Sequence, residues 1–225
     1  MASTAPKRAA DTTLLLFGPQ TPRLAPSRLL ELWSAINANP KLGFLAEIVK
    51  TLPSLWEDTI LPSCPSFSNL SSVGEQLQRL VQYFDTGATE SLPTEPPYEF
   101  LLVPLTVISQ IAEYISLDRE GTVQGFCVGF LSAAAVASSH DEAELHRWTA
   151  TAVRLALCVG AIIDIDERER SSNRSSTWSI RWTSDAQEDH FRRTLASFPG
   201  VQVRVRYAFR ALMHLPGIRL LQYRY

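Results

Sequence analysis

The chain has 225 residues, of which 45% are hydrophobic and 20% are charged, and its formal net charge at pH 7 is -2. This length and composition are typical of a soluble globular protein with one large domain, or with a domain and a small subdomain. A net charge so close to zero gives no electrostatic reason to expect a nucleic-acid partner or an anionic membrane surface.

The N-terminal residues and the cysteines indicate the cellular compartment in which the protein is expected. Residues 1–11 are polar and are expected to form a flexible N-terminus, and the apolar run after them, Leu14 to Phe17, is too short for a signal peptide or a membrane span. Three cysteines without a C-x-x-C pair argue against a disulfide framework and against a zinc site, so no metal is expected. These features favour a cytoplasmic protein without membrane association.

A first strand is predicted over Thr12 to Phe17, a short apolar run that is closed by Gly18-Pro19. Gln20 follows directly. It is either a solvated loop residue, as most glutamines are, or a ligand-binding group at the carboxyl end of a central strand. The local sequence leaves both interpretations open.

Apolar residues at helical spacing predict a series of helices after this strand, over residues 26–39, 42–61, 73–84 and 100–115. Pro53 is expected to break the second of them. An S-x-x-E pattern, Ser139 to Glu142, predicts a capping box that opens a further helix, and residues 164–176 are expected to form a charged, solvated loop. The predicted core face of that further helix consists of Leu145, Trp148, Ala152, Leu155, Val159 and Ile162.

The most distinctive stretch is Gly125-Phe-Cys-Val-Gly129, a G-x-C-x-G pattern between a predicted strand and an alanine-rich helix. The related G-x-S-x-G pattern is a sharp strand-to-helix turn that exposes a nucleophile, and its glycines are needed because the turn is strained and the helix packs close to the strand. A helix N-terminus stabilises negative charge and would favour the thiolate of Cys127. The backbone N–H of Val128 would then point toward the oxyanion of an acyl transition state.

A second interpretation of Cys127 is a glycine-flanked cysteine buried in a tight turn, since free cysteines are commonly buried. The five-residue pattern does not choose between the two, whereas the strand before it and the helix after it favour the nucleophile. The other cysteines lack a partner motif. Cys64 is interpreted as incidental and Cys158 as a core residue.

The late part of the chain predicts a small second unit. Thr177 to Trp182 and Val201 to Val205 alternate like strands, with a helical segment, Asp185 to Ser197, between them. This order predicts a partial α+β subdomain over residues 177–206, after a core over residues 12–170. Residues 207–225 are rich in Arg, Leu and Tyr without a clear period, and we hypothesise that this atypical tail reflects truncation or a shifted reading frame. Sequencing the transcript across Gly200 tests that hypothesis.

Several stretches carry a resemblance to a known family: Leu14-Leu-Leu-Phe-Gly-Pro-Gln-Thr21, the G-x-C-x-G stretch with its small-residue helix, Ala152-Val-Arg-Leu-Ala156 and Phe198-Pro-Gly200. Together they resemble a fungal starter-unit acyl-carrier-protein transacylase, the N-terminal domain of non-reducing polyketide synthases. The resemblance covers about residues 10 to 205, and two motifs in the right order make it more specific than the turn alone.

The resemblance implies a malonyl-transacylase-like α/β fold, an α/β-hydrolase-like core with an inserted ferredoxin-like subdomain, here incomplete at the C-terminus. It implies that Cys127 is the nucleophile, that Gln20 and Val128 frame the oxyanion hole, and that Gly125 and Gly129 are the glycines of the elbow. The cysteine would take an acyl group from acyl-CoA and pass it to the phosphopantetheine of an acyl carrier protein in polyketide biosynthesis. The implied partners are that carrier protein or the rest of a polyketide synthase, and no bound cofactor is expected.

The chain departs from the family pattern at the general base, a histidine that the resemblance places beyond the small subdomain. His140 and His146 are expected at the surface, His190 falls in the subdomain helix, and His214 lies in the atypical tail, so the base is left unassigned. General-base assistance contributes about 10²–10⁴-fold in rate. The final core strand and its helix would also be absent, which would leave apolar surface exposed.

Three functions remain in competition. The first is starter-unit acyl transfer, with Arg154 as a solvated helix charge and an uncharged acyl starter. The second is a catalytically inactive remnant that at most docks a carrier protein, which the missing late histidine favours. The third is a cysteine-dependent thioesterase, which would release free acid from acyl-CoA.

Overall fold

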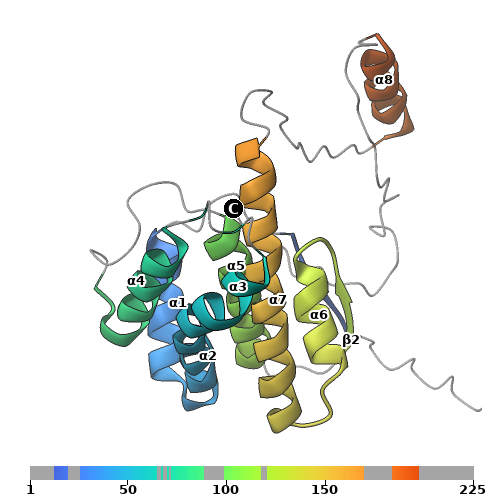
Figure 1. Cartoon of the computed structure of the whole chain (residues 1–225). Coiled ribbons are helices and arrows are strands. Elements are labelled where there is room, and N and C mark those ends of the chain that lie inside the picture. The colour runs from blue at the N-terminus through green and yellow to red at the C-terminus, as the bar shows by residue number, and fades with distance from the viewer. Residues whose placement is uncertain are drawn as a thin grey trace, which may run out of the picture.

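The computed structural model describes residues 13–19, 26–64, 67, 70, 72–88, 99–117, 121–169 and 184–197 (Figure 1). Most of this part of the chain is helical. Its elements are β1 (Leu14–Phe17), α1 (Pro26–Ala38), η1 (Pro40–Leu42), α2 (Gly43–Leu55), η2 (Trp56–Ile60), α3 (Leu61–Ser63), α4 (Val73–Thr86), α5 (Glu99–Leu117), β2 (Thr122–Gly125), α6 (Gly129–Ala137), α7 (Glu142–Glu169) and α8 (Asp185–Ala196).

The two described strands form a small parallel sheet. β1 pairs with β2 in a register that sets Leu14 opposite Thr122 and Phe17 opposite Gly125. Parallel strands need a long connection, and here the chain from α1 to α5 runs between them. Since α6 packs against both strands and against α5, the predicted α/β class is confirmed at this level.

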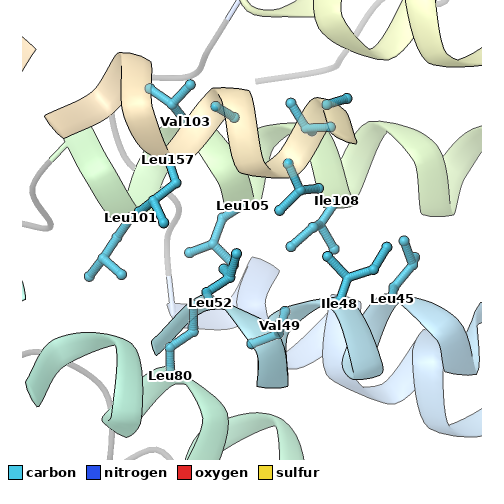
Figure 2. Packing of buried hydrophobic residues seen from close by; sticks show 14 of the residues in the cluster. Leu45, Ile48, Val49, Leu52, Leu80, Leu101, Val103, Leu105, Ile108 and Leu157 are labelled. Atoms are coloured by element: carbon cyan, nitrogen blue, oxygen red, sulfur yellow. The ribbon is translucent and has the colours of Figure 1, made fainter. Parts of the chain in front are cut away.

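The helix α5 is the centre of the core. Every side chain from Phe100 to Ile108 is buried, and α5 contacts α1, α6 and α7. Figure 2 shows apolar side chains of α2, including Leu52, directed toward Leu105 and Ile108 of α5 and toward Leu80 of α4. A helix that is mostly apolar and buried on all sides in its first half suits such a central position.

The helix α7 comes closest to α5 at Gly160, and its buried face combines alanines with Val153 and Leu157. A Cβ on Gly160 would collide with the backbone oxygen of Glu99, and Ala156 and Ala161 beside it are fully buried. The predicted core face is therefore wrong in most of its members. Ala152 is buried and Leu145 is half-buried, whereas Trp148, Leu155, Val159 and Ile162 are exposed.

Residues predicted to lie in a loop continue α7 instead. The helix extends to Glu169, and the side chain of Asp164 is only 4% exposed. Its two carboxylate oxygens accept hydrogen bonds from the backbone N–H groups of Glu99 (3.0 Å) and Phe100 (2.9 Å). Asp164 is thus a buried cap for the first turn of α5, because those amides have no acceptor within their own helix.

Two further local predictions are wrong. Pro53 lies inside α2, and the helical course continues beyond it through the π-helical turn η2 to α3. The capping box of α7 is shifted by two residues from Ser139. Asp141 accepts from the Glu144 amide (2.8 Å), and the Glu144 carboxylate accepts from the His140 amide (2.9 Å).

The late part of the chain is described only at α8, which confirms the helix predicted over residues 185–197 and stands apart from the other helices in Figure 1. Both predicted strands of the small subdomain and the tail over residues 207–225 lie outside the described residues. The malonyl-transacylase-like fold, the ferredoxin-like subdomain and the domain boundaries therefore stay predictions.

By length and composition, two helices in the described part of the chain could cross a membrane: α5 and the stretch Glu142–Asp166 of α7. The sequence had predicted no membrane association. Because α5 is buried among the other helices, its apolar character is accounted for by the core of a globular domain.

Candidate active site

The turn between β2 and α6 places Cys127 at a bend in the backbone. The N–H of Phe126 continues the sheet by donating to the carbonyl of Phe17 (2.9 Å), and the N–H of Gly129 closes the turn on the carbonyl of Phe126 (3.0 Å). Between them, Cys127 has a φ of 58°, and it is the one described residue other than glycine with a positive φ. This strand, left-handed residue and helix form a nucleophile-elbow geometry.

Both glycines of the elbow are required by close backbone approach. A Cβ on Gly125 would lie 2.5 Å from the Cα of Phe130 and would also collide with the carbonyl of Gly129. A Cβ on Gly129 would collide with the carbonyl oxygens of Phe17 and Gly18 at the end of β1. The start of α6 is therefore pressed against the end of β1, as the motif predicts.

The side chain of Cys127 is exposed, so the alternative of a buried cysteine in a tight turn is wrong. Its thiol makes no hydrogen bond with any described residue. The other two cysteines, Cys64 and Cys158, are half-buried against the core. Burial raises the pKa of the Cys158 thiol, which disfavours its reactive thiolate.

Val128 precedes the first residue of α6 with helical backbone angles, φ -57° and ψ -34°. Its N–H finds no acceptor among the described residues, as is common at a helix start. Such an N–H carries the positive end of the helix dipole. The role of Val128 in an oxyanion hole stays a prediction.

Gln20, the second predicted oxyanion residue, lies outside the described residues. The chain leading to it is described through Pro19. Gly18, two positions before Gln20, has its carbonyl oxygen against the Cα of Gly129. The end of β1 through Gly18 thus lies next to the start of α6.

Gln110, a buried glutamine in the otherwise apolar α5, was not predicted as a site residue from the sequence. Its side-chain N–H donates to the carbonyl of Gly18 (2.8 Å), and its side-chain oxygen accepts from the hydroxyl of Ser132 in α6 (2.6 Å). A lone amide within a mostly apolar helix is the signal that could have singled it out, because a buried amide needs partners.

None of the histidines in the described part of the chain is a hydrogen-bond partner of Cys127. His140 is exposed before α7, and His190 is exposed on α8. His146 is half-buried, not simply at the surface, because its ring stacks on Phe44 with centroids 3.7 Å apart. His214 lies outside the described residues, so a general base is not assigned.

Arg154 is exposed on α7, as expected of a solvated helix charge. No group of three or more His, Cys, Asp or Glu side chains within the described ranges is arranged to bind a metal ion.

A groove runs beside β1 and the C-terminal half of α5, lined in part by Leu16, Gln110, Tyr114 and Leu117. Cys127 is not among its lining residues.

Fold and site together define an α/β domain with an exposed cysteine at a nucleophile-type elbow. Residues 15–202 match the profile of a family described as "Starter unit:ACP transacylase in aflatoxin biosynthesis". The chain belongs to this starter-unit acyl-carrier-protein transacylase family.

Relatives of the chain are fungal polyketide synthases. The chain is 36% identical over 199 residues to the non-reducing polyketide synthase adrD of Penicillium roqueforti, and the match covers 85% of this chain and 8% of that protein. It is 32% identical over 209 residues to the non-reducing polyketide synthase nvfA of Aspergillus novofumigatus, covering 90% of this chain and 9% of that protein. The chain thus spans less than a tenth of the length of these relatives.

Proposed function

We propose that the chain is a starter-unit acyltransferase of polyketide biosynthesis, which moves an acyl group from acyl-CoA through Cys127 to an acyl carrier protein. The observation that carries this proposal is the exposed thiol of Cys127 on a left-handed residue between β2 and α6. Membership of the transacylase family supports the reaction class.

In the first half-reaction, the Cys127 thiolate attacks the carbonyl carbon of the acyl-CoA thioester and forms a new C–S bond. The tetrahedral intermediate collapses by breaking its bond to the coenzyme A sulfur, which leaves as a thiolate and takes up a proton. In the second half-reaction, the phosphopantetheine thiol of the carrier protein loses its proton and attacks the acyl-Cys127 thioester. Cys127 is released as the thiolate, so atoms and charge balance over the cycle.

The developing negative charge on the acyl oxygen would be stabilised by the Val128 N–H and by Gln20. The Val128 N–H is available because no described residue accepts from it. A pre-positioned donor of this kind is typically worth about 10²–10³-fold in rate. Thioester exchange is nearly isoenergetic, so stabilising the intermediate matters more than driving the reaction.

The proposed partners are a carrier protein and the further domains of a polyketide synthase, with acyl-CoA as the donor substrate and a cytoplasmic location. No bound cofactor takes part, since both acyl carriers are substrates. The malonyl-transacylase-like fold belongs to the same proposal, supported by the parallel β1–β2 pair and the elbow between β2 and α6.

A second candidate is an inactive remnant that only docks a carrier protein. The observation favouring it is that the Cys127 thiol has no hydrogen-bond partner among the described residues, so no described base activates it. Binding of a carrier protein without transfer of label would separate this candidate from the enzyme.

The test is a two-step transfer assay. The purified chain is incubated with radiolabelled acetyl- or hexanoyl-CoA, and a phosphopantetheinylated carrier protein is then added. We expect label to appear first on the chain and then on the carrier protein, and we expect Cys127→Ala to abolish both steps. Cys64→Ala is the matched control, because it removes another free thiol and leaves the elbow intact.

Three outcomes would contradict acyl transfer. A folded wild-type chain that takes up no label is not an acyltransferase, and if it still binds the carrier protein it is the remnant. Release of labelled free acid in place of transfer identifies a thioesterase. Transfer that survives in Cys127→Ala places the nucleophile elsewhere.

A further inference from the structure

We propose that Gln110 is a positioning residue for the acyl-transfer site, joining the end of β1 to the helix that follows Cys127. This inference rests on the proposed function. It concerns a residue of the core helix α5, not of the elbow motif, and its side chain is only 4% exposed.

The side chain of Gln110 forms a two-sided bridge. On one side it donates to the carbonyl of Gly18 at 2.8 Å, and on the other it accepts from the Ser132 hydroxyl at 2.6 Å. The Gly18 carbonyl can only accept, so the amide N–H₂ must face β1 and the amide oxygen must face α6. Ser132 is fully buried, so its bond to Gln110 is shielded from competing water, whereas the bond to Gly18 is partly buried.

The two ends of this bridge lie on the two segments that meet at the elbow. Gly18 directly follows β1, and Ser132 lies one helical turn after Val128. The backbones of these segments also touch directly, since the Gly18 carbonyl lies against Gly129. The contact between the Gly18 carbonyl and Gly129 limits how closely the end of β1 and the start of α6 can approach. The Gln110 bridge prevents these two segments from separating or sliding.

Catalytic donors act only when they lie within a fraction of an ångström of their productive positions, and a displacement of about 1 Å can cost 10²-fold in rate. Loss of the bridge is therefore expected to lower the rate of Cys127 acylation with little change in the affinity for acyl-CoA. Gln110 touches neither substrate nor thiol in this proposal. It acts by holding the start of α6, and with it the Val128 N–H, against the end of β1.

The first test compares Gln110→Met with the control Thr106→Val. The methionine side chain would keep the shape and apolar burial of the glutamine but lose both hydrogen bonds. Thr106 is buried in the same helix and donates only to the carbonyl of Leu102 (2.8 Å), so its loss weakens α5 without touching the site. We expect kcat for acylation to fall by about 10–10²-fold in Gln110→Met, with KM for acyl-CoA unchanged, and neither value to change in Thr106→Val.

The second test uses Gln110→Glu, which has the size of the natural side chain. A protonated carboxyl can donate to Gly18 and accept from Ser132, whereas an ionised one would place an acceptor against the Gly18 carbonyl. Burial raises the pKa of such a carboxyl, so the protonated form persists at mildly acidic pH. We expect the ratio of variant to wild-type activity to be highest at low pH and to fall as the pH rises through that pKa, with circular dichroism confirming the fold at each pH.

The outcomes separate the two proposals. A wild-type chain that is folded but never acylated at Cys127 overturns the proposed function and this inference with it. A wild-type chain that is acylated, beside a folded Gln110→Met variant of equal kcat, overturns the positioning role alone. If Gln110→Met does not fold, a Gln110→Glu activity ratio that does not vary with pH overturns the positioning role.

Discussion

At the scale of single residues, the backbone of Cys127 is held in a conformation that L-residues avoid. A left-handed backbone costs a residue other than glycine on the order of 1–3 kcal/mol, which the surrounding structure must sustain. Here the Phe126 and Gly129 hydrogen bonds and the packing of α6 on both strands sustain it. The cost is consistent with a thiol that is presented to solvent at a reactive site.

Replacing Gly129 tests how closely the elbow must pack. In Gly129→Ala the new Cβ would meet the carbonyls of Phe17 and Gly18, so β1 and α6 must move apart. We expect a loss of about 1–3 kcal/mol in the free energy of unfolding, measured by urea denaturation, and a loss of Cys127 acylation.

The matched control is Gly43→Ala at the first residue of α2. A Cβ there meets nothing within 4 Å, and the backbone is already right-handed helical. This variant should be unchanged or about 0.4–1 kcal/mol more stable. Equal stability and acylation in the two variants would show that the Gly129 contact is not needed.

The residues of the site differ in how far the sequence could predict them. The turn at Cys127 was predictable because its glycines and cysteine lie within five consecutive residues. Gln110 was not, since its partner Gly18 lies 92 positions away and nothing near Gln110 in the sequence indicates that contact. Gln20 lies outside the described residues, so its role stays a prediction, and the general base stays unassigned.

At the scale of elements, the helices from α1 to α5 could be predicted from apolar spacing, but the buried face of α7 could not. The predicted face contained Trp148, Leu155, Val159 and Ile162, all of which are exposed. The structure instead buries the face with Val153, Leu157 and the alanines, because Gly160 on that face lets α7 approach the backbone of α5. A pattern of hydrophobicity carries no information on which face another helix approaches most closely.

The cap on α5 is a second feature that only the tertiary structure reveals. Asp164→Asn would keep one acceptor for the Glu99 and Phe100 amides and replace the other with an amide group that cannot accept. We expect the free energy of unfolding to fall by about 1–3 kcal/mol, because a buried donor loses a charged acceptor. Thermal or urea denaturation measures it.

Asp58→Asn is the control for this substitution, because Asp58 is exposed. It should change stability by no more than about 0.5 kcal/mol. If Asp164→Asn is as stable as Asp58→Asn, the two hydrogen bonds to α5 do not stabilise the fold.

At the scale of the whole molecule, the described part of the chain is a helical core around α5 with a two-stranded parallel sheet at one side (Figure 1). On α7, Leu155 is 51% and Ile162 is 57% exposed. The sheet and helices bring the end of β1, the elbow and Gln110 together from three distant parts of the sequence. This convergence is the physical basis for expecting a reactive site at Cys127.

Acylation of one thiol, that of Cys127, is the central claim, and peptide mapping by mass spectrometry after incubation with acyl-CoA tests it most directly. We predict that the acyl group is found on the peptide containing Cys127, and that Cys158 stays unmodified because burial raises the pKa of its thiol. A folded chain that carries its acyl group on Cys64 or Cys158, or carries none on Cys127, would contradict the claim.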